Sequence, residues 1–534
     1  MTHAEKTRSS AVTVALAVLL CAAACGEVTD SLTITVVKAG SDLGDNPLEN
    51  VDTLRIHVLD DGYLEITEPL EFNPFDGSAE LSQLLNDRQT GVVRFQAEGL
   101  NGGVVVARGG TAYLTLGDGD LAIALFMGRI NTFHPTMTAD RVVSDLPFPL
   151  AGHTVTRLKD GRVLIVGGAT LDTAAGITDI SNRAIVYDPN TGEFNELPSQ
   201  LRIRRAFHTA TLLKASTLGG PQQVLIAGGI SLISGERMES SKLAEIFDPV
   251  SMSFTGQLLE MRQARYGHTA TLLISGDVLV AGGASLAAQQ LVANRPSPDD
   301  LVMDTVHANA DLFQFGAVPL GFAAETIPMD AARMFHVAGR GNGSLVMLAG
   351  GQSHSEVHLT TEVYNPGVGA LGSFGDGTPL LYPRTHATLT RLSNNDLLIV
   401  GGLTTLNDPS SATNRVERFI LGDTGQGTTE EVPVESRLIN RRWRHHTALM
   451  SDGQRVLVSG GLDTSGFTLN TAELVSVGSP TEVPPDMADG RVYHASTRLL
   501  SGDVIFVGGV SLSPSGGADP LLGCTIYTPA LVGD

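Results

Sequence analysis

The chain has 534 residues, of which 42% are hydrophobic and 17% charged, with 60 glycines and a formal net charge of −22. This composition excludes an intrinsically disordered chain, and the negative charge argues against a surface that binds nucleic acid. The length exceeds that of one ordinary domain unless the chain is a repeat array. Frequent glycines and few charged runs favour many short strands joined by turns.

Residues 1–25 are typical of a signal peptide, since Lys6 and Arg8 precede an apolar run that is too short for a comfortable membrane span. The run ends in CAAACG, which resembles a bacterial lipobox and implies a lipid on Cys25. Ordinary cleavage after AAA is the alternative. Because Gly26 follows the cysteine, the resemblance implies an exported protein of the outer membrane or periplasm, held at the membrane by lipid only.

Residues 26–30 are predicted to be a tether, and residues 31–130 a separate β-domain. Its apolar segments are separated by Gly, Asn and Asp, and they lie at 31–37, 51–60, 91–100, 103–116 and 120–127. This density of strands predicts a β-sandwich, of immunoglobulin-like type. After Cys25 the only cysteine is Cys524, so we expect no internal disulfide.

Residues 145–534 repeat one pattern seven times, after a segment at 131–144 expected to hold a linker and the first blade strand. Each copy has a strand that opens near a histidine, a buried apolar strand that ends on two glycines, a third strand such as AIVYDP, and a weaker fourth strand. Four strands at this period predict one propeller blade per copy. The repeated residues are His153, His208, His268, His336, His386, His446 and His494, and Gly167, Gly168, Gly228, Gly229, Gly282, Gly283, Gly350, Gly351, Gly401, Gly402, Gly460, Gly461, Gly508 and Gly509.

The paired glycines, the aromatic-Asp/Asn-Pro of the third strand and the Arg before the histidine resemble the kelch repeat. The resemblance covers about 145–534 and implies an all-β chain with a seven-bladed kelch-type propeller, whose loops open around the channel mouth. Trp443 is the only tryptophan, although Trp is common late in kelch repeats. The third-strand segment CTIYTP (524–529) lies near the end of the sequence. We therefore expect contiguous blades, closed by side-chain packing between the first and the last.

Each repeated residue type suggests a structural role. Paired glycines lack a Cβ and permit positive φ or close approach of the backbone, while unbroken runs such as VLIV predict strands buried on both faces. The Tyr or Phe of the third strand would fill the gap between blades. A histidine that recurs in every blade favours a hydrogen bond to the backbone of a neighbouring blade over a metal site or a catalytic base, which needs singular residues.

The arginines that precede the histidines leave two interpretations open. Each could pair with an acidic residue on the preceding strand, such as Glu245, Glu362, Glu417 or Glu473. Alternatively, a ring of guanidinium groups could bind a carboxylate-bearing peptide or an acidic sugar through bidentate hydrogen bonds. The candidate ligand-binding residues are Arg205, Arg265, Arg333, Arg384, Arg442, Arg444 and Arg491.

The sequence contains no recognisable nucleophile with its base, phosphate loop or dense acidic cluster. We therefore expect a monomeric, non-catalytic module without cofactor or metal that binds an unknown protein or glycan at the cell envelope. The long segment 284–308 could shape a partner site. His354 and His358 have a spacing that would share a metal on a helix, but they lie between two strands and no third ligand is evident.

The alternative function is an enzyme similar to galactose oxidase, an exported kelch propeller beside a β-sandwich. That family holds copper with two Tyr and two His, and one Tyr is bonded to a Cys. In this sequence Cys524 has Tyr527 close by, but the four ligands have no matching positions. The resemblance therefore leaves the copper site open.

Overall fold

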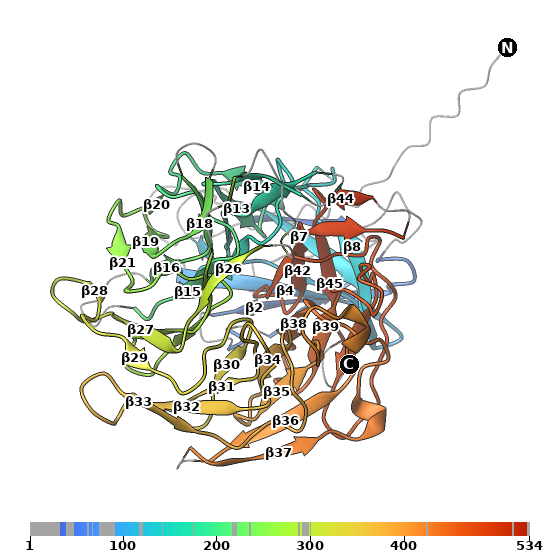
Figure 1. Ribbon diagram of the computed structural model, residues 1–534. Helices are drawn as coiled ribbons and strands as arrows, with labels where there is room; N and C mark the ends of the chain where they lie inside the picture. The colour runs from blue at the N-terminus through green and yellow to red at the C-terminus, as the bar shows by residue number, and fades with distance from the viewer. Residues whose placement is uncertain are drawn as a thin grey trace.

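The computed structural model shows a ring of small β-sheets with a further sheet behind it, drawn in blue in Figure 1. It describes residues 32–38, 47–60, 64–66, 68–73, 91–116, 121–140, 142–172, 174, 176–215, 222–233, 237–286, 289–290, 298, 301–422, 425–514 and 517–530. Cys25, the predicted signal peptide and the tether lie outside these ranges, as does much of 284–308. The described residues are all-β apart from two 3-10 turns, η3 (Pro409–Ser411) and η4 (Val434–Ser436). No helix among them is long and apolar enough to cross a membrane.

The N-terminal strands form one sheet in the order β1-β7-β5-β4-β2-β3, with β6 paired to β4. Its strands are β1 (Leu32–Lys38), β2 (Thr53–Leu59), β3 (Leu70–Phe72), β4 (Gly91–Asn101), β5 (Val104–Gly110), β6 (Leu114–Leu116) and β7 (Leu121–Arg129). β1 runs parallel to β7, and the other pairs are antiparallel. The described strands thus form one sheet, and the two-layered immunoglobulin-like sandwich stays a prediction.

Among the described residues, eleven antiparallel sheets follow. Four of them are small sheets formed within loops, and we number the other seven one to seven in chain order. Their first strands are β9 (Thr154–Arg157), β15 (Thr209–Leu212), β22 (Thr269–Leu272), β30 (Val337–Arg340), β34 (Thr388–Arg391), β38 (His446–Leu449) and β41 (Ala495–Arg498). Each first strand contacts that of the next sheet, and β41 contacts β9. The seven first strands therefore enclose a central channel.

The second strands end on the paired glycines, and all their residues are buried, as predicted. They are β10 (Val163–Val166), β16 (Val224–Ala227), β23 (Val278–Ala281), β31 (Val346–Ala349), β35 (Leu397–Val400), β39 (Val456–Ser459) and β42 (Val504–Val507). The third strands are β13 (Ala184–Asp188), β19 (Leu243–Asp248), β27 (Asn309–Gln314), β32 (Thr361–Asn365), β36 (Val416–Leu421), β40 (Ala472–Val475) and β45 (Thr525–Thr528). Tyr364 and Phe247 from these strands pack against the preceding sheet, which confirms the predicted role of the aromatic residue.

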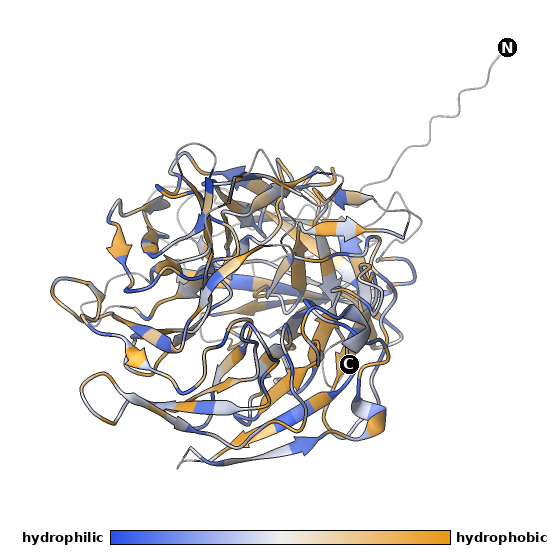
Figure 2. Ribbon diagram, viewed as in Figure 1, coloured by the Kyte–Doolittle hydropathy of each residue, from blue (hydrophilic) through white to orange (hydrophobic). Residues whose placement is uncertain are grey.

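The outer strands are shorter or more polar, and the GTTEE sequence of one of them, β37, is hydrophilic in Figure 2. They are β14 (Glu193–Glu196), β20 (Ser253–Phe254), β28 (Gly321–Phe322), β33 (Ser373–Asp376) and β37 (Gly427–Glu431), with β21 (Leu259–Glu260) and β29 (Ile327–Pro328) paired beside β19 and β27. Loops add β11 (Ala169–Leu171), β12 (Ile177–Ile180), β17 (Ile230–Ile233), β18 (Arg237–Ser240), β24 (Ala284–Leu286), β25 (Gln289–Gln290), β26 (Met303–Val306), β43 (Val510–Leu512) and β44 (Ala518–Pro520).

The expectation that every sheet is built from contiguous sequence is wrong. β8 (Thr132–Pro135) precedes the first sheet in the chain, yet it pairs with β45 as the outer strand of sheet seven. The register places Phe133 opposite Tyr527, and their rings lie 5.0 Å apart. Segment 131–144 therefore does not supply a strand to sheet one, and the ring closes through backbone hydrogen bonds between its two ends.

Paired glycines join each sheet to the next. Both members of all seven pairs have positive φ, as predicted, and the second donates its N–H to a backbone carbonyl of the following sheet. For example, the N–H of Gly168 donates to the carbonyl of Arg205 at 2.8 Å, and the N–H of Gly509 donates to that of Leu150. A Cβ on Gly167 would lie 2.4 Å from the carbonyl oxygen of Arg205, so any larger residue would push two sheets apart.

Candidate functional site at the channel mouth

Six of the seven candidate arginines are buried, with at most 1% exposure: Arg205, Arg265, Arg333, Arg384, Arg442 and Arg491. Each guanidinium donates to the carbonyl of the first paired glycine of its own sheet. Five of them also form an ion pair, and Arg491 donates instead to Thr525 Oγ1 at 3.4 Å. No ligand can reach these six side chains, so they are not the predicted binding ring.

The structural interpretation of the arginines is confirmed with one correction. Arg205 pairs with Glu245 at 3.0 Å and Arg333 with Glu362 at 2.9 Å, while Arg265 pairs with Asp311 at 2.5 Å. Glu417 and Glu473 pair in the same way with Arg384 and Arg442. The acid lies on the third strand of the same sheet, which follows the arginine, and not on the preceding strand. The pair fixes the segment that enters each sheet.

Three of the repeated histidines, His208, His268 and His336, join neighbouring sheets through side-chain hydrogen bonds. Among the described residues, His153 and His494 form no such bond. Nε2 of His336 lies 2.8 Å from Oγ1 of Thr269 in the preceding sheet, and His208 and His268 contact Thr154 and Thr209 in the same way. Burial, helped by the charge of Arg265, lowers the pKa of His268 to about 3. The three bonded histidines are therefore neutral structural residues, and their partner is a threonine side chain where the prediction named the backbone.

Two of the predicted histidines lie one residue out of register. In sheet five Ala387 takes the histidine position. Its Cβ lies beside the second paired glycine, Gly402, just as the Cβ of His336 lies beside Gly351 in sheet four. In sheet six His445 takes it, with Nε2 2.8 Å from Thr388 Oγ1, while His446 bonds to Ser496. The turn between the first and second strands of sheet six is one residue longer than the corresponding turn of sheets one, three, five and seven. In the sequence, His446 and not His445 therefore lies at the usual distance from the glycine pair.

The residue immediately before the structural histidine position forms the best candidate site. We call these seven residues the mouth ring: Gly152, Phe207, Gly267, Phe335, His386, Arg444 and Tyr493. All seven have φ between 50° and 64°, and all are half-buried. Bulky residues rarely adopt this conformation, and such strain concentrates at functional sites.

The backbone of the mouth ring is hydrogen-bonded from sheet to sheet. The N–H of Phe207 donates to the carbonyl of Gly152 at 2.7 Å, and the N–H of Gly152 donates to that of Tyr493 at 2.8 Å. The same bond joins Phe335 to Gly267. The N–H of His386 donates to the carbonyl of Phe335 at 3.2 Å, and the N–H of Arg444 donates to that of His386 at 3.1 Å. These bonds hold the positive φ angles and turn the side chains toward one another at the channel end.

Arg444 lies among the aromatic side chains of this site. Its guanidinium carbon is 5.1 Å from the ring centre of Tyr493, 5.2 Å from that of Trp443 and 5.6 Å from that of Phe335. The rings of Phe335 and His386 are 4.1 Å apart, and burial with the charge of Arg444 keeps the pKa of His386 well below its usual value. The site thus presents flat apolar faces around one permanent cation.

The two glycines of the mouth ring make room for these rings. A Cβ on Gly152 would lie 2.7 Å from the ring of Phe207, and one on Gly267 would lie 2.8 Å from the ring of Phe335. From the sequence, Arg444 was expected as a ligand-binding residue and His386 as a structural one, and the other five were not predicted. The missed signal was the residue before each histidine position, which is aromatic, glycine, histidine or arginine in all seven copies.

The other residues named from the sequence are not brought together. His354 is exposed, whereas His358 is buried with Nε2 2.9 Å from the carbonyl oxygen of Ala332, so the two do not share a site. Cys524 packs against sheet one and Tyr527 against sheet six, on opposite faces of β45. Burial raises the pKa of the Cys524 thiol to about 12. These placements do not assemble the copper ligand set implied by galactose oxidase.

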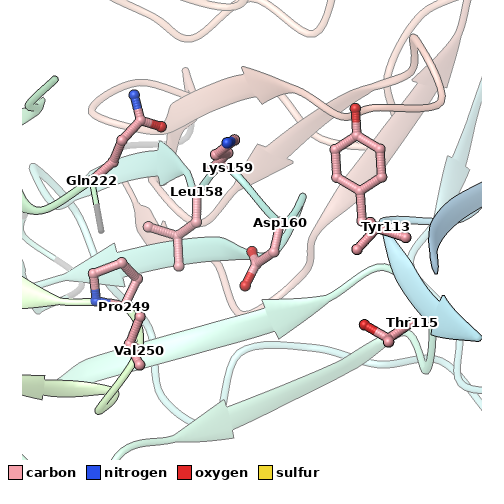
Figure 3. A pocket seen from close by; sticks show the side chains of 9 residues that line it. Tyr113, Thr115, Leu158, Lys159, Asp160, Gln222, Pro249 and Val250 are labelled. Atoms are coloured by element: carbon pink, nitrogen blue, oxygen red, sulfur yellow. The ribbon is translucent and has the colours of Figure 1, made fainter. Parts of the chain in front are cut away.

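A cleft of about 360 Å³ lies between the N-terminal sheet and the first two sheets of the ring. Figure 3 shows Leu158, Pro249 and Val250 on one side, Tyr113 on the other, and Asp160 between them. The N–H of Tyr113 donates to the carbonyl of Asp160 at 3.0 Å, which ties the two parts together here. The cleft contains none of the residues singled out from the sequence, and it is a junction between the two parts.

Comparison with known proteins supports a kelch-type β-propeller fold. No family model matches the sequence. The chain is 30% identical over 154 residues to kelch repeat and BTB domain-containing protein 12 of Danio rerio, a match to 26% of this chain and 23% of the relative. The chain thus spans less than a quarter of that relative's length.

Among solved structures, the chain is similar to a fungal alcohol oxidase of the AA5 family in complex with copper. The TM-score is 0.52 and the identity 14%, over 72% of this chain and 75% of the oxidase. At this identity the likeness concerns the fold alone. The chain is also similar to YjhT, with a TM-score of 0.44 and 13% identity over 64% of this chain and 99% of YjhT.

Proposed function

We propose that the chain is a seven-bladed kelch-type propeller that acts as a non-catalytic binding module for a protein or glycan ligand, which it contacts at the mouth ring. The observation that supports this function is the placement of Arg444 among Phe335, Trp443 and Tyr493 on strained backbone. Aromatic faces provide large contact area at low entropic cost, and the guanidinium provides a directed cation.

We further propose that the module is exported and monomeric, and that a lipid on Cys25 anchors it at the cell envelope, with no role in nucleic-acid binding. The basis is the lipobox-like CAAACG and the acidic composition. Acyl chains contribute about 0.8 kcal/mol per buried CH₂, so several chains give firm attachment. Cys25→Ser should move the protein from the membrane fraction to the soluble fraction, and a variant that stays with membranes would contradict the lipid anchor.

The ligand can be sought with the soluble form that begins after Cys25, on a glycan array and by pull-down from envelope extracts. Arg444→Ala and Tyr493→Ala should then weaken binding of the recovered ligand at least tenfold, because each removes a contact at the mouth. Arg441→Ala is the matched control, since Arg441 is exposed and lies three residues away. Unchanged binding in both mouth variants, with unchanged melting temperatures, would reject the mouth ring as the site.

The copper oxidoreductase is the alternative function. Elemental analysis of the purified protein tests it directly, and stoichiometric copper would favour the enzyme over the binding module.

A further inference from the structure

The central channel contains a second polar site at the end away from the mouth ring. A cavity of about 440 Å³ lies there between first strands of sheets one, two, six and seven. Most of its lining comes from the second halves of β9, β38 and β41, while the mouth ring precedes the first residue of each strand. The two sites are therefore separated along the channel.

The lining of this cavity combines two guanidiniums with hydroxyl groups. The polar residues are Arg157, Arg498, Thr156, Thr447, Ser496 and Thr497, and no carboxylate belongs to the lining. Small-molecule sites in proteins have volumes of about 300–1,000 Å³ and a few convergent polar groups. The cavity therefore has the size for a monosaccharide-sized ligand and the donors for an oxyanion.

Arginine recurs at this end of the channel. Arg157, Arg340, Arg391 and Arg498 are each the last residue of a first strand, and they are half-buried. Burial and the charge of Arg340 lower the pKa of Arg391, which indicates that two of the cations are close to each other. Four guanidiniums at one end of a channel are unusual in a chain with net charge −22.

The carboxylates in the turns after the first strands of sheets one, five, six and seven are engaged elsewhere. Asp160 pairs with Arg162 at 2.6 Å, Asp396 with Arg418 at 2.6 Å, and Asp452 with Arg455 at 2.5 Å. Asp503 accepts a hydrogen bond from Ser501. Within the described part of the chain, the Arg157 side chain has no hydrogen bond or ion pair with a protein group. Arg498 donates to the carbonyl of Leu449 at 3.3 Å. A half-buried guanidinium without an acidic partner, such as that of Arg157, favours an anion from outside the chain.

We propose that this end of the channel binds a monosaccharide-sized ligand through an oxyanion, either a carboxylate or a phosphate. Arg157 and Arg498 hold the charged group, since β9 and β41 are adjacent across the closure of the ring. The hydroxyls of Thr156 and Thr497 provide further donors. This site is separate from the mouth ring, so it stands whether or not the ligand proposed there is found.

Calorimetric titration of the soluble protein with D-glucuronate, D-glucose 6-phosphate and D-glucose tests the proposal. Saturable binding of glucuronate or of glucose 6-phosphate is expected, with none for glucose, and the preferred sugar identifies a carboxylate or a phosphate ligand. Arg157→Ala and Arg498→Ala should each weaken that binding by about tenfold or more, as expected for loss of a charge-assisted hydrogen bond. Saturable binding of neither anion would overturn the proposal.

Three variants serve as controls. Arg204→Ala removes an exposed guanidinium paired with Asp179 at 2.7 Å and should bind as the wild type does. Arg444→Ala lies at the other end of the channel and should also leave this binding unchanged. Arg157→Lys keeps the charge and should fold even where Arg157→Ala does not, with affinity between those of wild type and Arg498→Ala. Equal affinities in wild type, Arg157→Lys and Arg498→Ala would show that the anions bind elsewhere and reject the site.

Discussion

Arg333 and Glu362 form an ion pair inside sheet four, with Nη2 2.9 Å from Oε1 and both side chains at most 2% exposed. The carboxylate also accepts the backbone N–H groups of Asp330 at 2.8 Å and Ala331 at 3.1 Å. The guanidinium donates to the carbonyls of Gly350 and Thr360. A charge pair buried in this way fixes geometry, because every alternative arrangement leaves an unsatisfied ion.

Arg333→Ala should lower the free energy of unfolding by about 3–5 kcal/mol, since it leaves Glu362 buried without a cation. Denaturation in guanidinium chloride measures this change. Arg204→Ala, which breaks an exposed pair, should change the same quantity by about 1 kcal/mol or less. The double variant Arg333→Met with Glu362→Gln should recover part of the loss. Equal effects of the two single alanine variants would contradict a buried structural pair.

Stability should fall in acid because the structural histidines are held neutral. Burial lowers the pKa of His268 to about 3, whereas the unfolded chain binds a proton below its ordinary pKa of about 6.5. The contribution of neutral His268 to the free energy of unfolding is therefore intact above pH 6.5 and is lost as the pH falls toward 3. Between pH 7 and pH 5, the free energy of unfolding of His268→Gln should therefore fall by about 2 kcal/mol less than that of the wild type.

Urea denaturation at the two pH values gives the comparison. His354→Gln is the matched control, because His354 is exposed and should leave the pH dependence unchanged. Parallel stability curves for wild type and His268→Gln would contradict a neutral buried histidine at this position.

Closure of the ring depends on β8, so a change there should act locally on sheet seven. Phe133→Ala removes ring contacts with Tyr527 at 5.0 Å and Phe506 at 5.8 Å and should cost about 2–3 kcal/mol. Hydrogen exchange should show faster exchange in 525–528 than in the wild type, with little change in β32 of sheet four. Unchanged protection of 525–528 would mean that β8 does not secure the last sheet.

The positive φ of Phe335 predicts a reversal of the usual order of glycine and alanine. Both Phe335→Ala and Phe335→Gly delete the ring, but alanine keeps the strain of φ 50°. Phe335→Gly should therefore be more stable than Phe335→Ala by about 1 kcal/mol. At Phe374 on β33, an extended strand position, the alanine variant should be at least as stable as the glycine variant. The same order at both positions would contradict strain in the mouth ring.

The repeat pattern by itself determined the order of the first three strands within each sheet and the roles of several residues. Paired glycines, unbroken apolar strands and third-strand aromatic residues reflect backbone sterics and burial, which are set by neighbours a few residues away. The structural role of Arg205, Arg333 and the repeated histidines was also open to prediction, because a residue type that recurs at one position in most copies serves a need that those copies share.

Only the tertiary structure decided which residues lie opposite one another across sheets. β8 and β45 are almost 400 residues apart in the chain, and their pairing depends on where the ring closes. His445 replaces His446 because a one-residue difference in a turn shifts the register. The mouth ring gathers one residue from each sheet, and neither their shared φ nor the position of Arg444 among aromatic rings exists until backbone bonds join neighbouring sheets around the channel.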